Sequence, residues 1–437
     1  MLDTTGDSRH PLTRRAFLHR GLTFISLATT APLFLERAAH ALAPPAGSLL
    51  SGRPGVPEDR ILVVVQLGGG NDGLNTVVPY GSGAYYRIRR GLAIPAPNAA
   101  GAAPDRRALD LETASGIGLH PSLAAFKDLL DDGAAAIVQG VGYPNPNRSH
   151  FTSMDIWHTA DTDARGRGWI GRYLDHTCPG APDPQGTVSI GRTTPRALLG
   201  VRHKPTSFET AELFPRLGGE TRRMLKEPCP HIDRTDPAGS LKLDSSCRFL
   251  TRTALNAHVP SDRIRNAVAQ RPLVSYPRGP LAAQLRTVAG MIRGGLTTRV
   301  YYVSLSGFDT HARQLGRHAN LLRQLGDALN AFAADLKAQG DSGRVLTMVF
   351  SEFGRRVNPN ATGGTDHGTA APMFFIGDAV CPGLIGEHPS VTALDHGDLA
   401  FSMDFRCIYA AVLEDWMGAD AAAILGREYR KAQIIRA

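Results

Sequence analysis

The chain has 437 residues and a formal net charge of +8 at pH 7. Its lysines and arginines are scattered and form no long basic block, which argues against nucleic acid as a partner but allows anionic substrates. The five cysteines show no Cys-x-x-Cys spacing and no zinc-finger pattern. Cys229 and Cys247 could pair in an oxidising compartment, and the odd count leaves at least one thiol unpaired.

The first 43 residues predict an export signal that is not part of the fold. Arg14 and Arg15 precede an apolar run over residues 22–35 that is too short and too interrupted to span a bilayer. Small residues at 39–41 and 41–43 fit a signal-peptidase site. We therefore expect a twin-arginine signal peptide read by the twin-arginine export machinery. The mature protein would be periplasmic or secreted, without a transmembrane segment.

From residue 44 onward, strands alternate with helices, which predicts a single α/β domain. Continuous apolar runs predict buried strands over residues 60–67, 134–141, 299–305, 345–350 and 373–376. Helical spacing of apolar residues, or a helix-like segment, predicts helices over residues 120–130, 154–159, 281–292, 315–336 and 407–417. This order predicts a doubly wound, mostly parallel sheet with helices on both faces, in which ligands bind at the carboxyl ends of the strands.

The stretch over residues 180–280 is different, because prolines, glycines and short polar runs replace the alternation. We expect it to be an insertion, or a cap over the site, with a strand over residues 187–190 inside it.

Acidic and histidine side chains follow or precede the predicted strands at four places. These candidate metal ligands are Asp72, Asp309, His311, Glu352, Asp366 and His367. Any one of these acids could equally be a helix cap or a solvated loop residue. Their repetition at four strand ends favours a site for a divalent metal, and the carboxylate and imidazole ligands suit Zn²⁺, Mn²⁺, Mg²⁺ or Ca²⁺.

A candidate nucleophile and two candidate anion-binding residues lie near these strand ends. Ser149 precedes a predicted helix, where the helix dipole favours an alkoxide or a bound anion. It could equally be an unreactive helix cap. Arg148 and Arg355 could neutralise phosphate or sulfate oxygens with their forked guanidinium groups, or could form surface salt bridges.

Five motifs follow one another along the chain, namely GGGNDGLN at residues 68–75, NRSH at 147–150, GFDTH at 307–311, SEFGR at 351–355 and GTDHG at 364–368. Together and in this order they resemble the bacterial family known as domain of unknown function 1501. That family is similar to the alkaline phosphatase and sulfatase superfamily, whose members hold one or two metals beside a Ser, Thr or formylglycine nucleophile. The resemblance covers nearly the whole mature chain.

The resemblance implies roles for individual residues. It makes Asp72 the ligand after the first strand, Ser149 the nucleophile, Asp309 and His311 a ligand pair, and His367 a late histidine ligand. Two departures from the superfamily are visible. Glu352 and Phe353 stand where the superfamily has Asp-His, and one residue separates Asp309 from His311 where three are usual. One metal site, built from Asp309, His311 and His367 with help from Asp366, is therefore favoured over two.

The sequence thus predicts an exported metal-dependent hydrolase of phosphate or sulfate esters, acting on a small-molecule or glycan ester. The alternative is a catalytically degenerate relative that keeps the alkaline-phosphatase-like fold for binding a polysaccharide or a cell-surface partner.

Overall fold

The computed structural model describes residues 59–436 apart from 112–113, 115, 179–184 and 210–263. The expected signal peptide, Cys229, Cys247 and much of the middle stretch therefore lie outside the described residues. Within the described ranges, no helix is long and apolar enough to cross a membrane.

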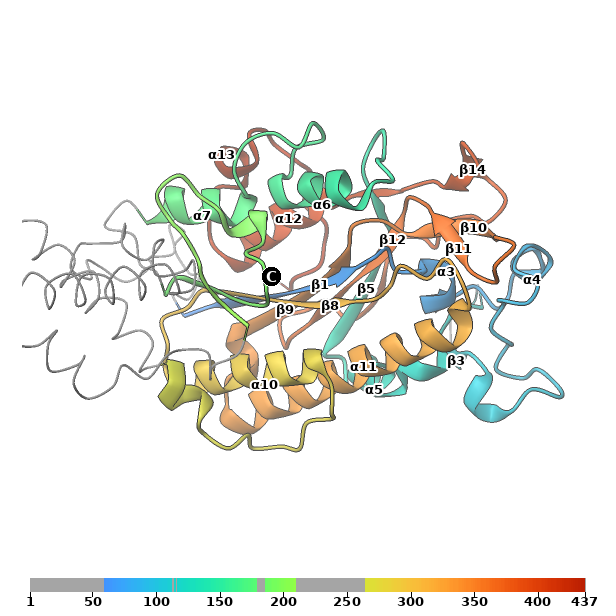
Figure 1. Cartoon of the computed structure of the whole chain (residues 1–437), viewed down its shortest axis with the longest axis horizontal. Coiled ribbons are helices and arrows are strands. Elements are labelled where there is room, and N and C mark those ends of the chain that lie inside the picture. The colour runs from blue at the N-terminus through green and yellow to red at the C-terminus, as the bar shows by residue number, and fades with distance from the viewer. Residues whose placement is uncertain (1–58, 112–113, 115, 179–184, 210–263, 437) are drawn as a thin grey trace, which may run out of the picture.

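A mostly parallel central sheet of nine strands forms the core of the described chain (Figure 1). Strand β1 (Ile61–Gly68) lies between β8 (Val300–Ser306) and β9 (Val345–Ser351) and pairs with both in parallel. Its continuous run of apolar residues is buried on both faces, as expected of an interior parallel strand.

The sheet extends from this centre in both directions. Beyond β9 lie β12 (Ala371–Ile376), which is antiparallel to its neighbours, β5 (Ala135–Gly142), β13 (Gly383–Ile385) and the short β16 (Met403–Asp404). Beyond β8 lie β6 (Thr187–Ile190) and β7 (Thr206–Phe208), both parallel. The expected strands are thus all present.

Helices cover both faces of the sheet (Figure 1). One face carries α5 (Ala124–Asp131), α10 (Pro280–Arg293) and α11 (Gln314–Gln339). The other face carries α6 (His150–Thr159), α7 (Trp169–Thr177), α12 (Phe405–Ala411) and α13 (Ala421–Leu425). Alternate residues of β1 divide between the two cores, with Val63 packed in the core of the first face and Leu62 in that of the second. The predicted α/β fold class is confirmed.

Smaller elements surround the sheet. Two short helices follow β1, namely α3 (Gly73–Thr76) and α4 (Gly83–Ile88). A three-stranded sheet comprises β2 (Val77–Val78), β3 (Leu109–Asp110) and β4 (Gly118–Leu119). Two hairpins comprise β10 (Arg355–Pro359) with β11 (Thr365–His367), and β14 (Leu394–Asp395) with β15 (Asp398–Leu399).

The topology brings the predicted site segments to one edge of the sheet. Strands β8, β1 and β9 are parallel neighbours, so their carboxyl ends meet at the same edge. Strand β5 also ends there, because it is antiparallel to β12, which is antiparallel to β9. The segments that follow these four strands carry Asp72, Asp309, Glu352 and Ser149.

The structure differs from the sequence expectations in two places. Helix α6 begins at His150, four residues earlier than expected, so this histidine lies on the first turn of the helix. In the middle stretch, β7 is a strand that the sequence did not predict, and with β6 it extends the central sheet beside β8; an insertion over residues 180–280 stays a prediction. A cap formed by other residues of that stretch stays a prediction.

Burial of His158 generates a prediction about acid stability. His158 lies on α6 with Nε2 3.0 Å from the Tyr302 hydroxyl, and burial lowers its pKa from 6.5 to about 3. Between pH 6.5 and about 3, His158 therefore binds a proton in the unfolded chain but not in the folded protein. The free energy of unfolding should fall as the pH drops below about 6.5, by up to about 1.4 kcal/mol per pH unit.

We expect His158→Gln to flatten the dependence of the unfolding free energy on pH, measured by urea titration at several pH values. Equal slopes in the wild type and the variant would contradict this expectation.

Candidate metal centre

The carboxylate of Asp309 is surrounded by the imidazoles of three histidines. Its Oδ1 lies 3.0 Å from His311 Nε2, 3.2 Å from His367 Nε2 and 3.5 Å from His150 Nε2. The four residues come from the segment after β8, from strand β11 and from the first turn of α6. His150, Asp309 and His367 can each offer one ligand atom, and these atoms all lie within 4.8 Å of one another.

The Nδ1 atom of each histidine is held by an acceptor. His150 Nδ1 lies 2.8 Å from Glu352 Oε1, His311 Nδ1 lies 3.1 Å from Asp366 Oδ1, and His367 Nδ1 lies 2.8 Å from the Arg148 carbonyl oxygen. An oxygen acceptor requires an N–H donor, so with a proton on each Nδ1 the lone pairs of the three Nε2 atoms would be free to bind a metal. This is the arrangement by which carboxylates and carbonyls orient metal-binding histidines in proteins.

Apart from Arg355 Nη1, which lies 3.5 Å from His311 Nε2, the Nε2 atoms of His311 and His367 face each other and Asp309. His311 Nε2 and His367 Nε2 are 2.9 Å apart, and both lie near Asp309 Oδ1. Lone pairs at such distances repel one another unless a proton or a metal cation lies among them. His150 Nε2 is buried and has no hydrogen-bond partner in the described part of the chain. The cluster thus has the form of a cation-binding site.

Electrostatics favour an ionised aspartate in this cluster. Partial burial alone would raise the pKa of Asp309, but hydrogen bonds from Arg355 and His367 outweigh burial and lower the pKa to about 2. The hydrogen bond to Glu352 raises the pKa of His150, whereas burial lowers the pKa of His367. At neutral pH Asp309 therefore offers a charged oxygen.

Glu352 and Asp366 lie around the cluster and support its histidines. Glu352 is buried, and its Oε1 accepts from the Gly69 amide at 2.8 Å as well as contacting His150. Asp366 is exposed, and hydrogen bonds from Asn360 and His311 lower its pKa. The structure gives both residues orienting contacts where the sequence suggested direct ligands.

Asp72 is separate from the cluster, contrary to the sequence expectation. Both of its oxygens face the fully buried guanidinium of Arg89, at 2.5 and 3.0 Å, and Gln314 Nε2 donates to the same carboxylate. Burial alone would raise the pKa of Asp72, but Arg89 outweighs it and lowers the pKa. Asp72 therefore forms a buried ion pair with Arg89 and is not a ligand in the cluster.

The two predicted anion-binding arginines differ in their surroundings. Arg355 is fully buried and donates to four backbone carbonyls and to Asp309 Oδ1, so it is not placed to meet a substrate. Arg148 is partly exposed and pairs with the buried carboxylate of Asp398, which Arg356 also approaches at 3.7 Å. Two guanidinium groups thus share one carboxylate, which leaves a local positive charge.

Ser149 is exposed and occupies the residue before α6. Its side chain makes no capping hydrogen bond to the helix, although its backbone amide donates to Asn147 Oδ1 at 2.8 Å. Its neighbours in the chain both contact the cluster, Arg148 through its carbonyl and His150 through its ring. The hydroxyl is therefore not used as a helix cap.

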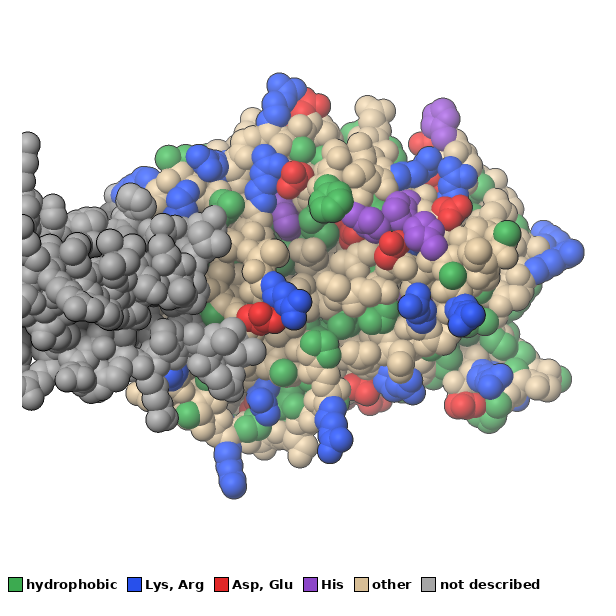
Figure 2. Space-filling view, viewed as in Figure 1, with side chains coloured by type: hydrophobic (Ala, Val, Ile, Leu, Met, Phe, Trp, Pro, Cys, Tyr) green, Lys and Arg blue, Asp and Glu red, His purple; other side chains and the backbone are tan. Residues whose placement is uncertain are grey.

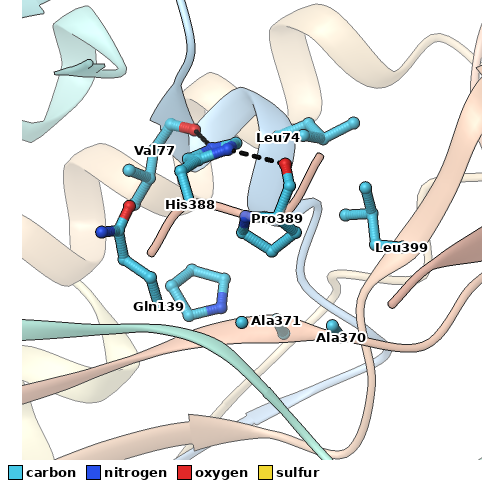
Figure 3. A pocket seen from close by; sticks show the side chains of 11 residues that line it. Leu74, Val77, Gln139, Ala370, Ala371, His388, Pro389 and Leu399 are labelled. Carbon is cyan, nitrogen blue, oxygen red and sulfur yellow. Dashed lines mark hydrogen bonds between the residues drawn. The ribbon is translucent and has the colours of Figure 1, made fainter. Parts of the chain in front are cut away.

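The cluster lies on the surface, where Figure 2 shows histidine and acidic side chains gathered on one face near β10 and β11. A separate, largely apolar pocket, lined by residues that include Leu74, Val77 and Leu399, involves none of the cluster residues. His388 lines that pocket, with its two ring nitrogens each 3.0 Å from a carbonyl oxygen, of Val77 and Pro389 (Figure 3). The titratable groups suited to chemistry therefore belong to the cluster at the sheet edge.

The motifs at residues 307–311 and 364–368 supply Asp309, His311 and His367 to the cluster. The motif at 351–355 supplies residues that contact it. Residues 283–401 match the family described as protein of unknown function (DUF1501). This match confirms the resemblance that the motifs predicted and spans these three motifs. A comparison with curated proteins gave no match.

The chain is also similar to solved structures of the alkaline phosphatase and sulfatase superfamily. One is a protein in the alkaline phosphatase superfamily from Vibrio parahaemolyticus, with 10% identity, a TM-score of 0.38, and coverage of 90% of this chain and 76% of that chain. Another is BT1596, a 2-O GAG sulfatase, with 8% identity, a TM-score of 0.35, and coverage of 85% and 76%.

A third is the C-terminal periplasmic domain of EcEptC from Escherichia coli in complex with Zn, with 9% identity, a TM-score of 0.34, and coverage of 77% and 78%. At such identities and TM-scores, these likenesses say nothing of the chemistry of this chain.

The surroundings of Asp72 generate a prediction that separates it from the metal ligands. Asp72→Ala leaves the buried charge of Arg89 unpaired, which should cost about 3–5 kcal/mol of stability. Because Asp72 is outside the cluster, metal affinity of the folded variant should stay unchanged. Unfolding by urea and metal titration measure the two effects, and a selective loss of metal affinity would contradict the assignment.

Proposed function

We propose that this protein is an exported, metal-dependent hydrolase of phosphate or sulfate esters. The observation that carries the proposal is the convergence of three imidazole Nε2 atoms on Asp309, with each Nδ1 held by an acceptor. The expected export signal lies outside the described residues, so export rests on the sequence alone.

The residues present fit a divalent metal. Zinc with bonds of about 2.0–2.1 Å in a tetrahedral site places neighbouring ligand atoms about 3.3 Å apart. The distances of 3.5 and 3.2 Å from Asp309 Oδ1 to His150 Nε2 and His367 Nε2 agree with this spacing. We therefore assign these three residues as the primary ligands and place His311 beside them.

The partly exposed face of the cluster can receive a substrate. A bound divalent ion would act as a Lewis acid on a phosphoryl or sulfuryl oxygen. Arg148 and Arg356 carry more positive charge than Asp398 neutralises, which favours an anionic ester beside the cluster.

Ser149 is the proposed nucleophile, because its side chain does not cap the helix and both of its neighbours in the chain contact the cluster. Its Oγ forms the bond to phosphorus or sulfur and the alcohol of the ester leaves, after which water releases the bound group. The start of α6 favours negative charge on this oxygen.

Metal analysis of the purified protein tests the ligand assignment. We expect close to one divalent ion per chain in the wild type. His150→Ala and His367→Ala should each weaken binding by more than the about 10–100-fold that loss of a supporting partner costs.

His396→Ala is the matched control, because this histidine is 94% exposed and lies outside the cluster. Wild-type protein without a bound or bindable divalent ion would exclude the metal-dependent hydrolase.

Activity on chromogenic aryl phosphates and sulfates tests the nucleophile. Ser149→Ala should reduce turnover by about a thousandfold or more while metal content stays unchanged. Thr152→Ala, an exposed residue of the same helix, is the control. Unchanged turnover in Ser149→Ala would assign the attack to water. A metal-loaded protein that turns over no ester in the panel would instead favour the degenerate binding protein.

A further inference from the structure

The guanidinium of Arg355 fills a cage of oxygen atoms. Its Nε donates to the Gly70 carbonyl at 2.8 Å and its Nη1 to the Thr365 carbonyl at 2.9 Å. Its Nη2 donates to the carbonyls of Gly69 and Phe308 and, at 2.7 Å, to Asp309 Oδ1. The Arg355 side chain is fully buried, although the Asp309 side chain is 48% exposed, so the N–H groups of Arg355 and not water satisfy the oxygens that face them.

The five oxygens come from three segments that meet at the candidate site. Gly69 and Gly70 follow β1, Phe308 and Asp309 follow β8, and Thr365 begins β11. Arg355 itself begins β10 and lies opposite His367 in the β10–β11 pairing. One side chain thus joins the loops that carry Asp309, His311 and His367.

The loop after β1 is built to approach this side chain closely. Gly70 has a φ of +77°, and a Cβ there would lie 2.5 Å from the Phe353 ring and 3.3 Å from Arg355 Nε. Only glycine provides both the backbone conformation and the space that bring its carbonyl onto the guanidinium.

We propose that Arg355 is a positioning residue that acts as a built-in cation of the metal centre. It holds Asp309 in place for one divalent ion through Oδ1, the oxygen that also faces the histidines, and it fills the oxygen-lined space beside that atom. Carbonyl and carboxylate oxygens in such number are the ligands of a hard cation, so the guanidinium takes the place that a second ion would need. This inference rests on the proposed metal site.

Zinc titration of Arg355→Ala tests the proposal. The variant should bind Zn²⁺ about 10–100-fold more weakly than the wild type, because a supporting contact of a ligand is lost. Millimolar guanidinium chloride should restore much of this affinity by entering the vacated cage, whereas sodium chloride at equal ionic strength should not. Wild-type affinity in Arg355→Ala, or no restoration by guanidinium, would overturn the proposal.

A second measurement uses chelator-treated protein and does not depend on metal. Guanidinium at the same concentration should raise the melting temperature of Arg355→Ala relative to sodium chloride and should not raise that of the wild type. If the wild type binds no zinc, the proposed function fails, and this measurement still decides whether the cage selects a guanidinium. No stabilisation of the variant would overturn the cage itself.

Arg355→Lys covers the case in which Arg355→Ala does not fold. Lysine keeps the charge but lacks the planar fork, so it should bind Zn²⁺ at least several-fold more weakly than the wild type. Equal affinity in this variant would show that the fork is not needed. At saturation the wild type should hold one ion per chain, and two would overturn the assignment of Arg355 to the second position.

Discussion

The candidate site depends on the parallel pairing of β1 with β8 and β9. Because three neighbouring strands point the same way, the loops that follow them leave the sheet side by side and bring together residues far apart in sequence. Strand β12 enters in the opposite direction and allows the hairpin of β10 and β11 to return His367 over the same edge. The cluster of imidazoles around Asp309 is a consequence of this topology.

Charge is arranged in layers beneath that edge. The ion pair of Asp72 and Arg89 is fully buried, and the equally buried Arg355 contacts the partly exposed Asp309. Thr365 links the two layers, since its hydroxyl donates to Gln314 Oε1 at 2.6 Å while its carbonyl accepts from Arg355. Each buried charge has a partner of opposite sign or a set of dipoles, which is the condition under which burial is tolerated. The loops of the site are thereby held from below.

The sequence predicted much of the fold, because long apolar runs and helical periodicity mark strands and helices that are buried on one or both faces. It was less informative about the middle stretch, where β6 and β7 are short and separated by irregular chain. Their place at the sheet edge depends on pairing with β8, a contact distant in sequence that local pattern does not encode.

For the site, the sequence identified Asp309, His311 and His367, whose side chains the structure brings together. It also named Asp72 and Arg355. It could not show that Asp72 pairs with Arg89, because no motif marks Arg89 as a partner. Nor could it show that the hydrogen bonds of Arg355 go to protein oxygens. His150 was overlooked as a ligand, although it follows Ser149 in the NRSH motif. The usable signal was its position just beyond the carboxyl end of β5.

Helix α6 has a consequence for how precisely the chemistry is aligned. Its Trp157 ring stacks against Phe350 and Phe405 at centroid distances of 5.1 and 4.4 Å, and its indole N–H donates to the Glu352 carbonyl at 2.9 Å. The carboxylate of Glu352 contacts the other end of the helix, because its Oε1 lies 2.8 Å from His150 Nδ1. Contacts near both ends thus fix the position of α6. Trp157 lies about 10 Å along the helix from its first turn. A change in the packing of this indole would therefore move Ser149 and His150 together.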